Sequence, residues 1–328
     1  MSRFRSAVAA APTAVFSSTA ARAREFERAD RVIRAPLALS HRIAFTQLSG
    51  GAGASAVAAY VAGLLAHRRQ GPVLGVNASG GRRTLLWHAG LTGSDDPAPA
   101  GDPGSDPREH ASRDAIGGTR SSGLPGRRAS EVGRDIDPRR LRPTSFADAS
   151  ASLERTAGGL YTLDVRADPT GIAATEADWA TPVAPITRFY DVVCTDWGVR
   201  RPELDLGGVA AGSHTVCLVA RADRSSLEEA VAVTAALRDL ENRPHVVVAA
   251  VDLGHTAGRA LEAVRWNDSC VIVRVPFDPG RSEAAPVASG RLSTRSRMAH
   301  TRLAAELMPP LRPTAGVAPT SLFEGVSG

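Results

Sequence analysis

Short runs of apolar residues recur along the chain, and most of them are rich in valine, isoleucine and leucine. Such runs, bounded by glycine, proline or charged residues, are typical of strands buried on both faces of a sheet. Elsewhere apolar residues recur at spacings of three and four, which is the period of a helix with one buried face. The pattern predicts strands within 42–48, 71–79, 158–168, 188–199, 212–222, 243–254 and 268–279, and helices over 56–69, 225–240 and 297–311, with a further helix between the last two strands.

The order of these elements predicts a single α/β domain. Strands that alternate with helices form a mostly parallel sheet covered by helices, and its crossovers should be right-handed. In the helix over 225–240, Ser225 or Ser226 is expected to cap the first turn.

The regular pattern is absent from three segments. Residues 1–38 are expected to form a flexible tail, because their apolar part is broken by Pro12 and followed by charges. Residues 93–130 consist mainly of Gly, Pro, Ser, Asp and Arg, which predicts a disordered insertion. Residues 311–328 form a second tail, so the predicted domain spans 39–310.

Composition limits the chemistry that the chain can perform. Its 328 residues, 43% of them hydrophobic, are enough to bury one large core or two modest ones. All 39 Lys+Arg positions are arginine, so the chain has no lysine. The net charge of +5 permits binding to nucleic acid, but the arginines are scattered, so a dedicated nucleic-acid surface is not expected.

One loop has a layout with chemical meaning. Residues 43–69, IAFTQLSGGAGASAVAAYVAGLLAHRR, read as a strand, a glycine-rich turn and an alanine-rich helix. This is the layout of a phosphate-binding loop, in which backbone N–H groups at the start of the helix face an anion.

Four segments in this order resemble the MinD/ParA family of P-loop ATPases, and within it the MinD-like proteins found beside actinobacterial type VII secretion genes. They are IAFTQLSGGAGAS at the family's phosphate loop, GPVLGVNAS at its second strand, FYDVVCTDWG before switch II, and VIVRVPFDP at its late IPxD segment. RPTSFADASASLERTAGGLYTLDVRADP is similar to the secretion-associated branch. The resemblance covers about 40–308 and implies a three-layer P-loop NTPase-like α/β domain, with a mostly parallel central sheet flanked by helices.

Both lysines of the family's loop are replaced in this chain. The resemblance places Ser49 at the lysine that reaches across a dimer to the partner's phosphates, and Ala54 at the lysine that grips the transferred phosphate. The loop glycines remain, and Ser55 stands at the place of the magnesium-binding hydroxyl. Backbone N–H groups can still attract phosphate, but the charge that stabilises the transferring phosphoryl group is lost.

The carboxylates of the second strand are replaced as well. Asn77 and Ser79 stand where the family has a DxD pair for magnesium and the attacking water. Asp196 matches the switch II aspartate, although a strand-end aspartate that caps a neighbouring helix is the alternative interpretation. The residues expected to bind nucleotide or phosphate are Gly50, Gly51, Ala52, Gly53, Ala54, Ser55, Ala56, Asn77, Pro276 and Asp278, with Ser55 and Asp196 as magnesium ligands only if nucleotide binds.

These replacements fall on separate loops that meet only at the nucleotide, so we expect a pseudo-ATPase with no catalytic residue. Such a protein would act by binding, as a homodimer, in a heterodimer with a catalytic relative, or on secretion machinery. The alternative is an active but atypical ATPase, with ATP or ADP and Mg as cofactors and Asp196 as a catalytic residue. An arginine would then replace the lysine, and the nearest candidates are Arg42, Arg82 and Arg83.

Other function classes have less support. The sequence after 311 lacks the basic amphipathic helix by which MinD attaches to membranes, so no direct membrane anchor is expected. The eight histidines lack metal-ligand spacing, and the three cysteines are expected to be buried thiols of a cytoplasmic protein. A ParA-like nucleic-acid surface would use arginines whose simpler explanation is a solvated helix face. They are Arg291, Arg295, Arg297 and Arg302.

Overall fold

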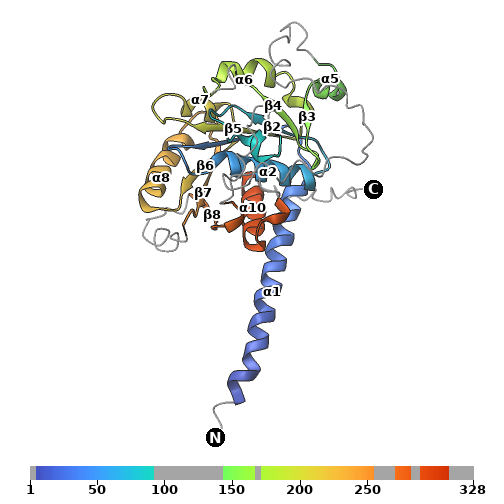
Figure 1. Cartoon of the computed structure of the whole chain (residues 1–328). Coiled ribbons are helices and arrows are strands. Elements are labelled where there is room, and N and C mark those ends of the chain that lie inside the picture. The colour runs from blue at the N-terminus through green and yellow to red at the C-terminus, as the bar shows by residue number, and fades with distance from the viewer. Residues whose placement is uncertain (1–4, 92–142, 167–170, 255–269, 282–288, 310–328) are drawn as a thin grey trace, which may run out of the picture.

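The structure is a computed structural model of the chain, and it describes residues 5–91, 143–166, 171–254, 270–281 and 289–309 (Figure 1). The insertion predicted at 93–130, the tail at 311–328 and the helix predicted between the last two strands lie outside the described residues.

Eight strands form one sheet in the order β3-β4-β2-β5-β1-β6-β7-β8. All neighbouring pairs are parallel except β3 and β4, which pair antiparallel at the edge. The mostly parallel α/β sheet that the sequence predicts is therefore confirmed. The strands are β1 (His41–Gln47), β2 (Val73–Asn77), β3 (Glu154–Arg155), β4 (Tyr161–Asp164), β5 (Val192–Val199), β6 (Thr215–Arg221), β7 (His245–Val251) and β8 (Val271–Val275).

The strand order brings three chain segments together at one edge of the sheet. β1 and β2 are consecutive in sequence, yet β5 lies between them and pairs with both. Because the three strands are parallel, their carboxyl ends reach the same edge. Ligands of open α/β sheets bind at such edges, outside the carboxyl ends of the strands.

Helices cover both faces of the sheet (Figure 1). They are α1 (Arg5–Arg34), α2 (Ala54–Arg68), α3 (Leu85–His88), α5 (Phe146–Ser150), α6 (Glu176–Val183), α7 (Leu206–Ala211), α8 (Arg224–Arg238) and α10 (Thr294–Leu307), with short 3-10 turns η2 (Thr187–Phe189), η3 (Pro279–Arg281) and η4 (Ser289–Arg291).

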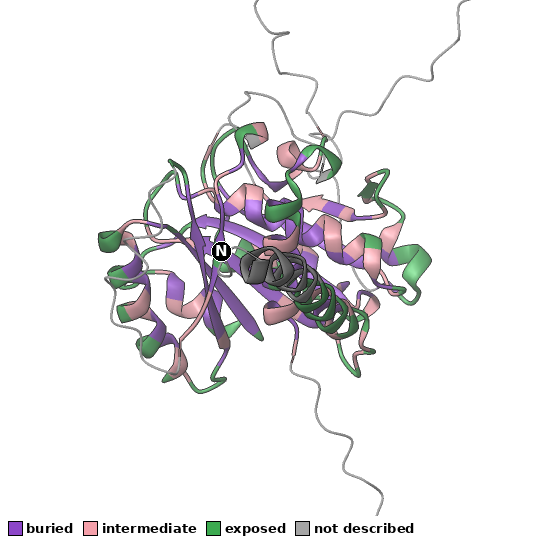
Figure 2. Cartoon of the chain, turned by 90° about the horizontal axis from the view of Figure 1, so that it is seen from below, coloured by how far each residue is buried: buried purple, intermediate pink, exposed green. Residues whose placement is uncertain are grey.

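The two faces carry separate hydrophobic cores. Alternate strand residues point to opposite faces, so Ile43 and Phe45 of β1 join one core and Ala44 the other. The first core packs against α2, α10 and the end of α1, and the second against α6, α7 and α8. Figure 2 shows the strands buried between these layers. The helices thus hold the sheet rigid, which fixes the loops at its edges.

The N-terminal segment differs from the prediction. Residues 5–34, expected to be part of a flexible tail, form helix α1, which extends away from the sheet (Figure 1). Its last two turns are anchored, because Ile33 is fully buried and Ala29 is 9% exposed. Asp30 of α1 also pairs with Arg68 at the end of α2. Two buried residues within a charged, alanine-rich sequence give too weak a pattern to reveal this packing.

The cap of helix α8 is Asp223, two residues before Ser225 and three before Ser226. Its carboxylate accepts hydrogen bonds from the Ser226 amide (2.9 Å) and from the hydroxyls of Ser225 (2.9 Å) and Ser226 (3.0 Å). The prediction of Ser225 or Ser226 as the cap is therefore wrong. A carboxylate here accepts several donors at once, which a serine hydroxyl cannot do.

Candidate functional site

The glycine loop keeps the backbone shape of a phosphate-binding turn. It runs from the end of β1 into α2, and Gly51 (φ +83°) and Gly53 (φ +88°) adopt left-handed conformations that glycine accepts without strain. Gly53 is the cap residue of α2 and supplies no side-chain hydrogen bond. The first amides of α2 are therefore left to other acceptors.

One of these amides is bonded within the loop. The Ala54 amide donates to the Gln47 Oε1 atom at 3.3 Å. Ala52 and Ala54 themselves are buried in the core beneath the loop, 2% and 1% exposed. The loop therefore offers backbone donors and no side-chain cation of its own.

The second strand ends in two buried polar residues that bond to their neighbours. The Ser79 hydroxyl lies 2.8 Å from Asn77 Oδ1 and 2.9 Å from Asp196 Oδ2. The Asn77 amide group donates to Asp164 Oδ1 at 3.1 Å. A polar chain thus crosses the sheet edge from β4 through β2 to β5.

Asp196, on β5, ends this chain and has the most hydrogen-bond partners in it. It is fully buried and accepts the amides of Gly198 (3.0 Å) and Leu85 (3.2 Å), besides the hydroxyl of Ser79. Burial raises the pKa of Asp196, while hydrogen bonds from Ser55, Ser79, Gly198 and Leu85 oppose the rise. Four donors match the roughly four acceptor positions of a carboxylate, so little is left for a cation.

Asp196 contacts both the glycine loop and the short helix α3. Ser55 from the glycine loop donates a hydrogen bond to it. The carboxylate also binds the amide of Leu85, the first residue of the short helix α3, which is the helix-capping role.

Arg166, just past β4, belongs to no motif of the sequence and was not expected at the site. Its guanidinium binds Asp164 in a fork, with Nε 3.0 Å from Oδ1 and Nη2 2.6 Å from Oδ2. Its Nη1 donates to the Gly81 carbonyl at 2.9 Å. Arg166 therefore neutralises the carboxylate nearest to Asn77 and ties the loop after β2 to β4.

A second arginine locks the loops after β2 and β5. Arg200 is buried, and it donates to the carbonyls of Trp197 (3.0 Å), Ala78 (3.3 Å) and Ala174 (2.7 Å) and to Asp205 (3.0 Å). Such a fork of five fixed donors holds several chain segments at one spacing.

Gly198 packs tightly against the loop after β2. It has φ +65°, and a Cβ atom added to it would lie 2.8 Å from the Cβ of Ser79. The segment that corresponds to switch II therefore lies in direct contact with the end of β2, and a larger residue at 198 would push them apart.

Pro276 and Asp278, expected near a nucleotide base, follow β8, which lies three strands from β1 at the same edge. Asp278 accepts the Ser293 amide (2.9 Å) and hydroxyl (2.8 Å). Partial burial acts to raise the pKa of Asp278, but hydrogen bonds from Ser296, Ser293 and Gly280 outweigh it and lower the pKa to about 2. The carboxylate thus orders the start of α10.

The arginine candidates are separated by the fold. Arg42 lies at the start of β1, at the opposite edge of the sheet, where its Nε donates to the Gly212 carbonyl at 2.7 Å. Arg83 follows β2, and its guanidinium lies 5.5 Å from the centre of the Trp87 ring. Arg82, also after β2, is exposed. Arg82 and Arg83 therefore share the edge with the loop, whereas Arg42 is too far along the strand to replace its lysine.

The described ranges contain no group of three or more His, Cys, Asp or Glu residues placed to hold a metal ion. No helix in the same ranges is long and apolar enough to cross a bilayer.

No protein-family model matches the sequence, and no curated protein matches it either. Solved structures do match the fold. A chain of the MinC:MinD cell division protein complex of Aquifex aeolicus superposes with a TM-score of 0.51 at 16% identity, covering 83% of this chain and 98% of that chain. MinD of the same organism gives a TM-score of 0.50 at 14% identity, covering 83% and 100%. The chain therefore has the P-loop NTPase-like fold of these proteins.

Proposed function

We propose that this chain is a MinD-like protein that does not hydrolyse ATP and that acts by binding a protein partner. The observation that carries the proposal is the bonding of Asp196, whose carboxylate is occupied by Ser55, Ser79, Gly198 and Leu85. The carboxylate at the place of the switch II aspartate thus stabilises the protein's own loops.

The charges that phosphoryl transfer needs are also missing around it. Ala54 and Ser49 supply no cation, and Asn77 and Ser79 supply no anion. Preorganised charge at the transferring phosphoryl group is commonly the largest contribution to such catalysis, and the rate falls by orders of magnitude when one such donor is removed. A site without these charges has no means to turn over ATP at a useful rate.

A magnesium ion fits this set of residues poorly. Mg²⁺ needs octahedral oxygen ligands, usually including a carboxylate with a free oxygen. Ser55 and Asp196 are the candidate ligands, but both oxygens of Asp196 accept protein donors. Asp164, the nearest other carboxylate in the polar chain, is paired with Arg166.

The resemblance to secretion-associated MinD-like proteins favours a cytoplasmic role in actinobacterial type VII secretion or a related cell-envelope or partitioning process. The partner would be a second copy, a catalytic relative, or a component of the secretion machinery. A catalytic relative could supply the missing lysine across the interface.

Calorimetric titration with Mg-ATP and Mg-ADP tests whether the loop lost only its charge. We expect little or no binding to the native chain, and measurable binding after Ala54→Lys, which restores an ammonium at the start of α2. Because Ala54 is buried, Ser49→Lys at the exposed start of the loop serves as a second variant that leaves the core intact. Micromolar binding by the native chain, accompanied by phosphate release, would favour the active, atypical ATPase instead.

A further inference from the structure

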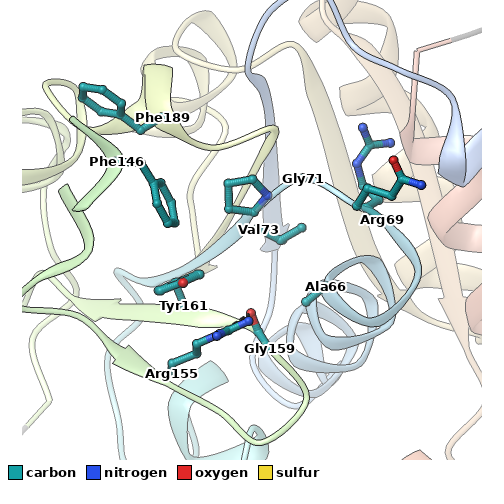
Figure 3. A pocket seen from close by; sticks show the side chains of 11 residues that line it. Ala66, Arg69, Gly71, Val73, Phe146, Arg155, Gly159, Tyr161 and Phe189 are labelled. Carbon is teal, nitrogen blue, oxygen red and sulfur yellow. Dashed lines mark hydrogen bonds between the residues drawn. The ribbon is translucent and has the colours of Figure 1, made fainter. Parts of the chain in front are cut away.

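A pocket of about 460 Å³ opens at the edge of the sheet opposite to the glycine loop (Figure 3). Its floor includes Val73 at the start of β2 and Tyr161 at the start of β4, so it lies at the amino ends of these strands. Its size falls within the usual range for small-molecule sites. The proposed function makes no use of it.

One side of the pocket is aromatic. Phe146 from α5, Tyr161 from β4 and Phe189 from η2 line it together with Pro72 (Figure 3). The rings of Phe146 and Tyr161 meet edge to face, with their centres 5.5 Å apart. Edge-to-face packing fixes both rings, which gives a preformed wall for another flat ring.

A guanidinium group stands beside this wall. Arg155 from β3 is exposed, and its guanidinium carbon lies 5.0 Å from the centre of the Tyr161 ring. Its Nε makes a long 3.5 Å hydrogen bond to the Gly159 carbonyl, and its Nη groups have no acceptor among the described residues. The cation is therefore positioned by the ring and keeps open donors.

The other charged groups at the pocket do not compete with Arg155. Arg69 also lines it, but its two Nη groups are engaged by Asp191 (3.0 Å) and by the carbonyls of Ile33 and Ala35, and its Nε is buried without a hydrogen-bond partner. None of the described residues that line the pocket is acidic. The open charge in the pocket is therefore positive and comes from Arg155.

We propose that this pocket binds a small molecule in which a flat aromatic ring carries one carboxylate. The ring would pack against Phe146, Tyr161 and Pro72, and the carboxylate would accept hydrogen bonds from the Nη groups of Arg155. Charge-assisted bonds of this kind are stronger than neutral ones, so the carboxylate sets the selectivity.

The probe for the test is 2-naphthoate, followed by ligand-observed NMR and compared with the neutral 2-naphthamide. A ligand of this size in a pocket of this kind should bind the native chain with a dissociation constant on the order of 1 mM. Arg155→Gln should weaken 2-naphthoate binding roughly five- to tenfold, a modest factor because the guanidinium is exposed. It should leave 2-naphthamide binding unchanged, because the aromatic wall is intact.

Arg295→Gln is the matched control, since Arg295 is an equally exposed arginine on α10. It should bind 2-naphthoate as the native chain does. Three results would overturn the proposal: no binding of 2-naphthoate by the native chain, equal binding by native and Arg155→Gln, or equal losses in Arg155→Gln and Arg295→Gln. None of these depends on nucleotide, so the test is separate from that of the proposed function.

Discussion

At the scale of single residues, the phosphate edge is held together by its own polar groups. The chain of hydrogen bonds from Arg166 through Asp164, Asn77 and Ser79 to Asp196 leaves few open acceptors. Buried networks of this kind rigidify a structure when every member is satisfied. These residues therefore stabilise the loops at this edge of the sheet.

Removing the centre of this network should destabilise the fold. Asp196→Ala would leave buried donors of Ser79, Gly198 and Leu85 unpaired, so we expect the free energy of unfolding in urea to fall by roughly 3 kcal/mol. Asp196→Asn keeps one acceptor oxygen and should cost about half as much. Glu203→Gln, at an exposed acidic position, is the control. If Asp196→Ala unfolds at the same urea concentration as the control, the network does not contribute to stability.

Some of these residue-level features could be predicted from the sequence, and others could not. The absence of lysine and the replacements at Ala54, Asn77 and Ser79 can be read directly. The role of Arg166 could not be, because an arginine two residues after an aspartate has many possible partners. Only the fold brings Asp164 beside Asn77, since β2 and β4 pair across a long stretch of intervening chain.

At the scale of elements, the buried strands and the main helices follow from hydrophobic patterns, whereas short and peripheral elements do not. The two-residue strand β3 and the helices α6 and α7 carry too few apolar residues to show a period. Helix α1 lies in a segment that was expected to be a tail, because Pro12 breaks its apolar part and charges follow. Its stability depends on tertiary contacts of its last turns, and these are invisible in a local pattern.

Helix α1 therefore provides a test of tertiary anchoring. Ile33 is fully buried in the core that α2 and α10 share. Ile33→Ala should lower the free energy of unfolding by roughly 3 kcal/mol, because it removes buried methyl groups and leaves a cavity. Arg31→Ala, at an exposed position on the same helix, should change it by less than about 0.5 kcal/mol. Equal, small effects would mean that the end of α1 is not packed on the domain.

Two histidines, His41 and His245, join the amino ends of β1 and β7 to the end of α10. His41 Nε2 lies 3.0 Å from the Leu307 carbonyl and 3.1 Å from Thr215 Oγ1, and His245 Nε2 lies 3.1 Å from the Glu306 carbonyl. The His41 ring stacks on His214, with ring centres 5.4 Å apart. A positive charge on His41 would therefore lie near the rings of His214 and His245 and near Arg69.

Burial lowers the pKa of His41 from 6.5 to about 4. The nearby charges of His214, Arg69 and His245 lower this pKa further, whereas the hydrogen bond to the Leu307 carbonyl acts to raise it. Burial also lowers the pKa values of His214 and His245. The unfolded chain thus binds more protons than the folded chain between pH 6.5 and about 4. The stability that the neutral His41 contributes is therefore fully present above pH 6.5 and is lost as the pH falls towards 4.

The measurement that checks this is urea unfolding at pH 7.5 and pH 5. His41 alone should account for a loss of about 2 kcal/mol over this interval. His41→Gln should show a correspondingly smaller loss, and the exposed His67→Gln should behave as the native chain does. A pH dependence that is the same in all three proteins would show that His41 does not titrate with an altered pKa.

At the scale of the whole molecule, we propose that the chain keeps the fold of a P-loop ATPase without its ATP-hydrolysing chemistry. The chain superposes on MinD structures over most of its length, which shows that the fold is shared. Fold alone does not determine function, which depends on the groups at the site. Here those groups are neutral, paired or directed into the protein, which supports the proposed binding role.

The measurement that tests this central claim most directly is phosphate release from saturating Mg-ATP by the purified chain, run beside Asp196→Asn. We expect the native chain to release phosphate at a rate that is indistinguishable from the rates of the variant and of buffer. Steady phosphate release by the purified native chain that disappears in Asp196→Asn would contradict the proposal that the chain does not hydrolyse ATP. That result would mean that Asp196 exchanges its protein partners for a metal ion and that Arg82 or Arg83 supplies the missing cation.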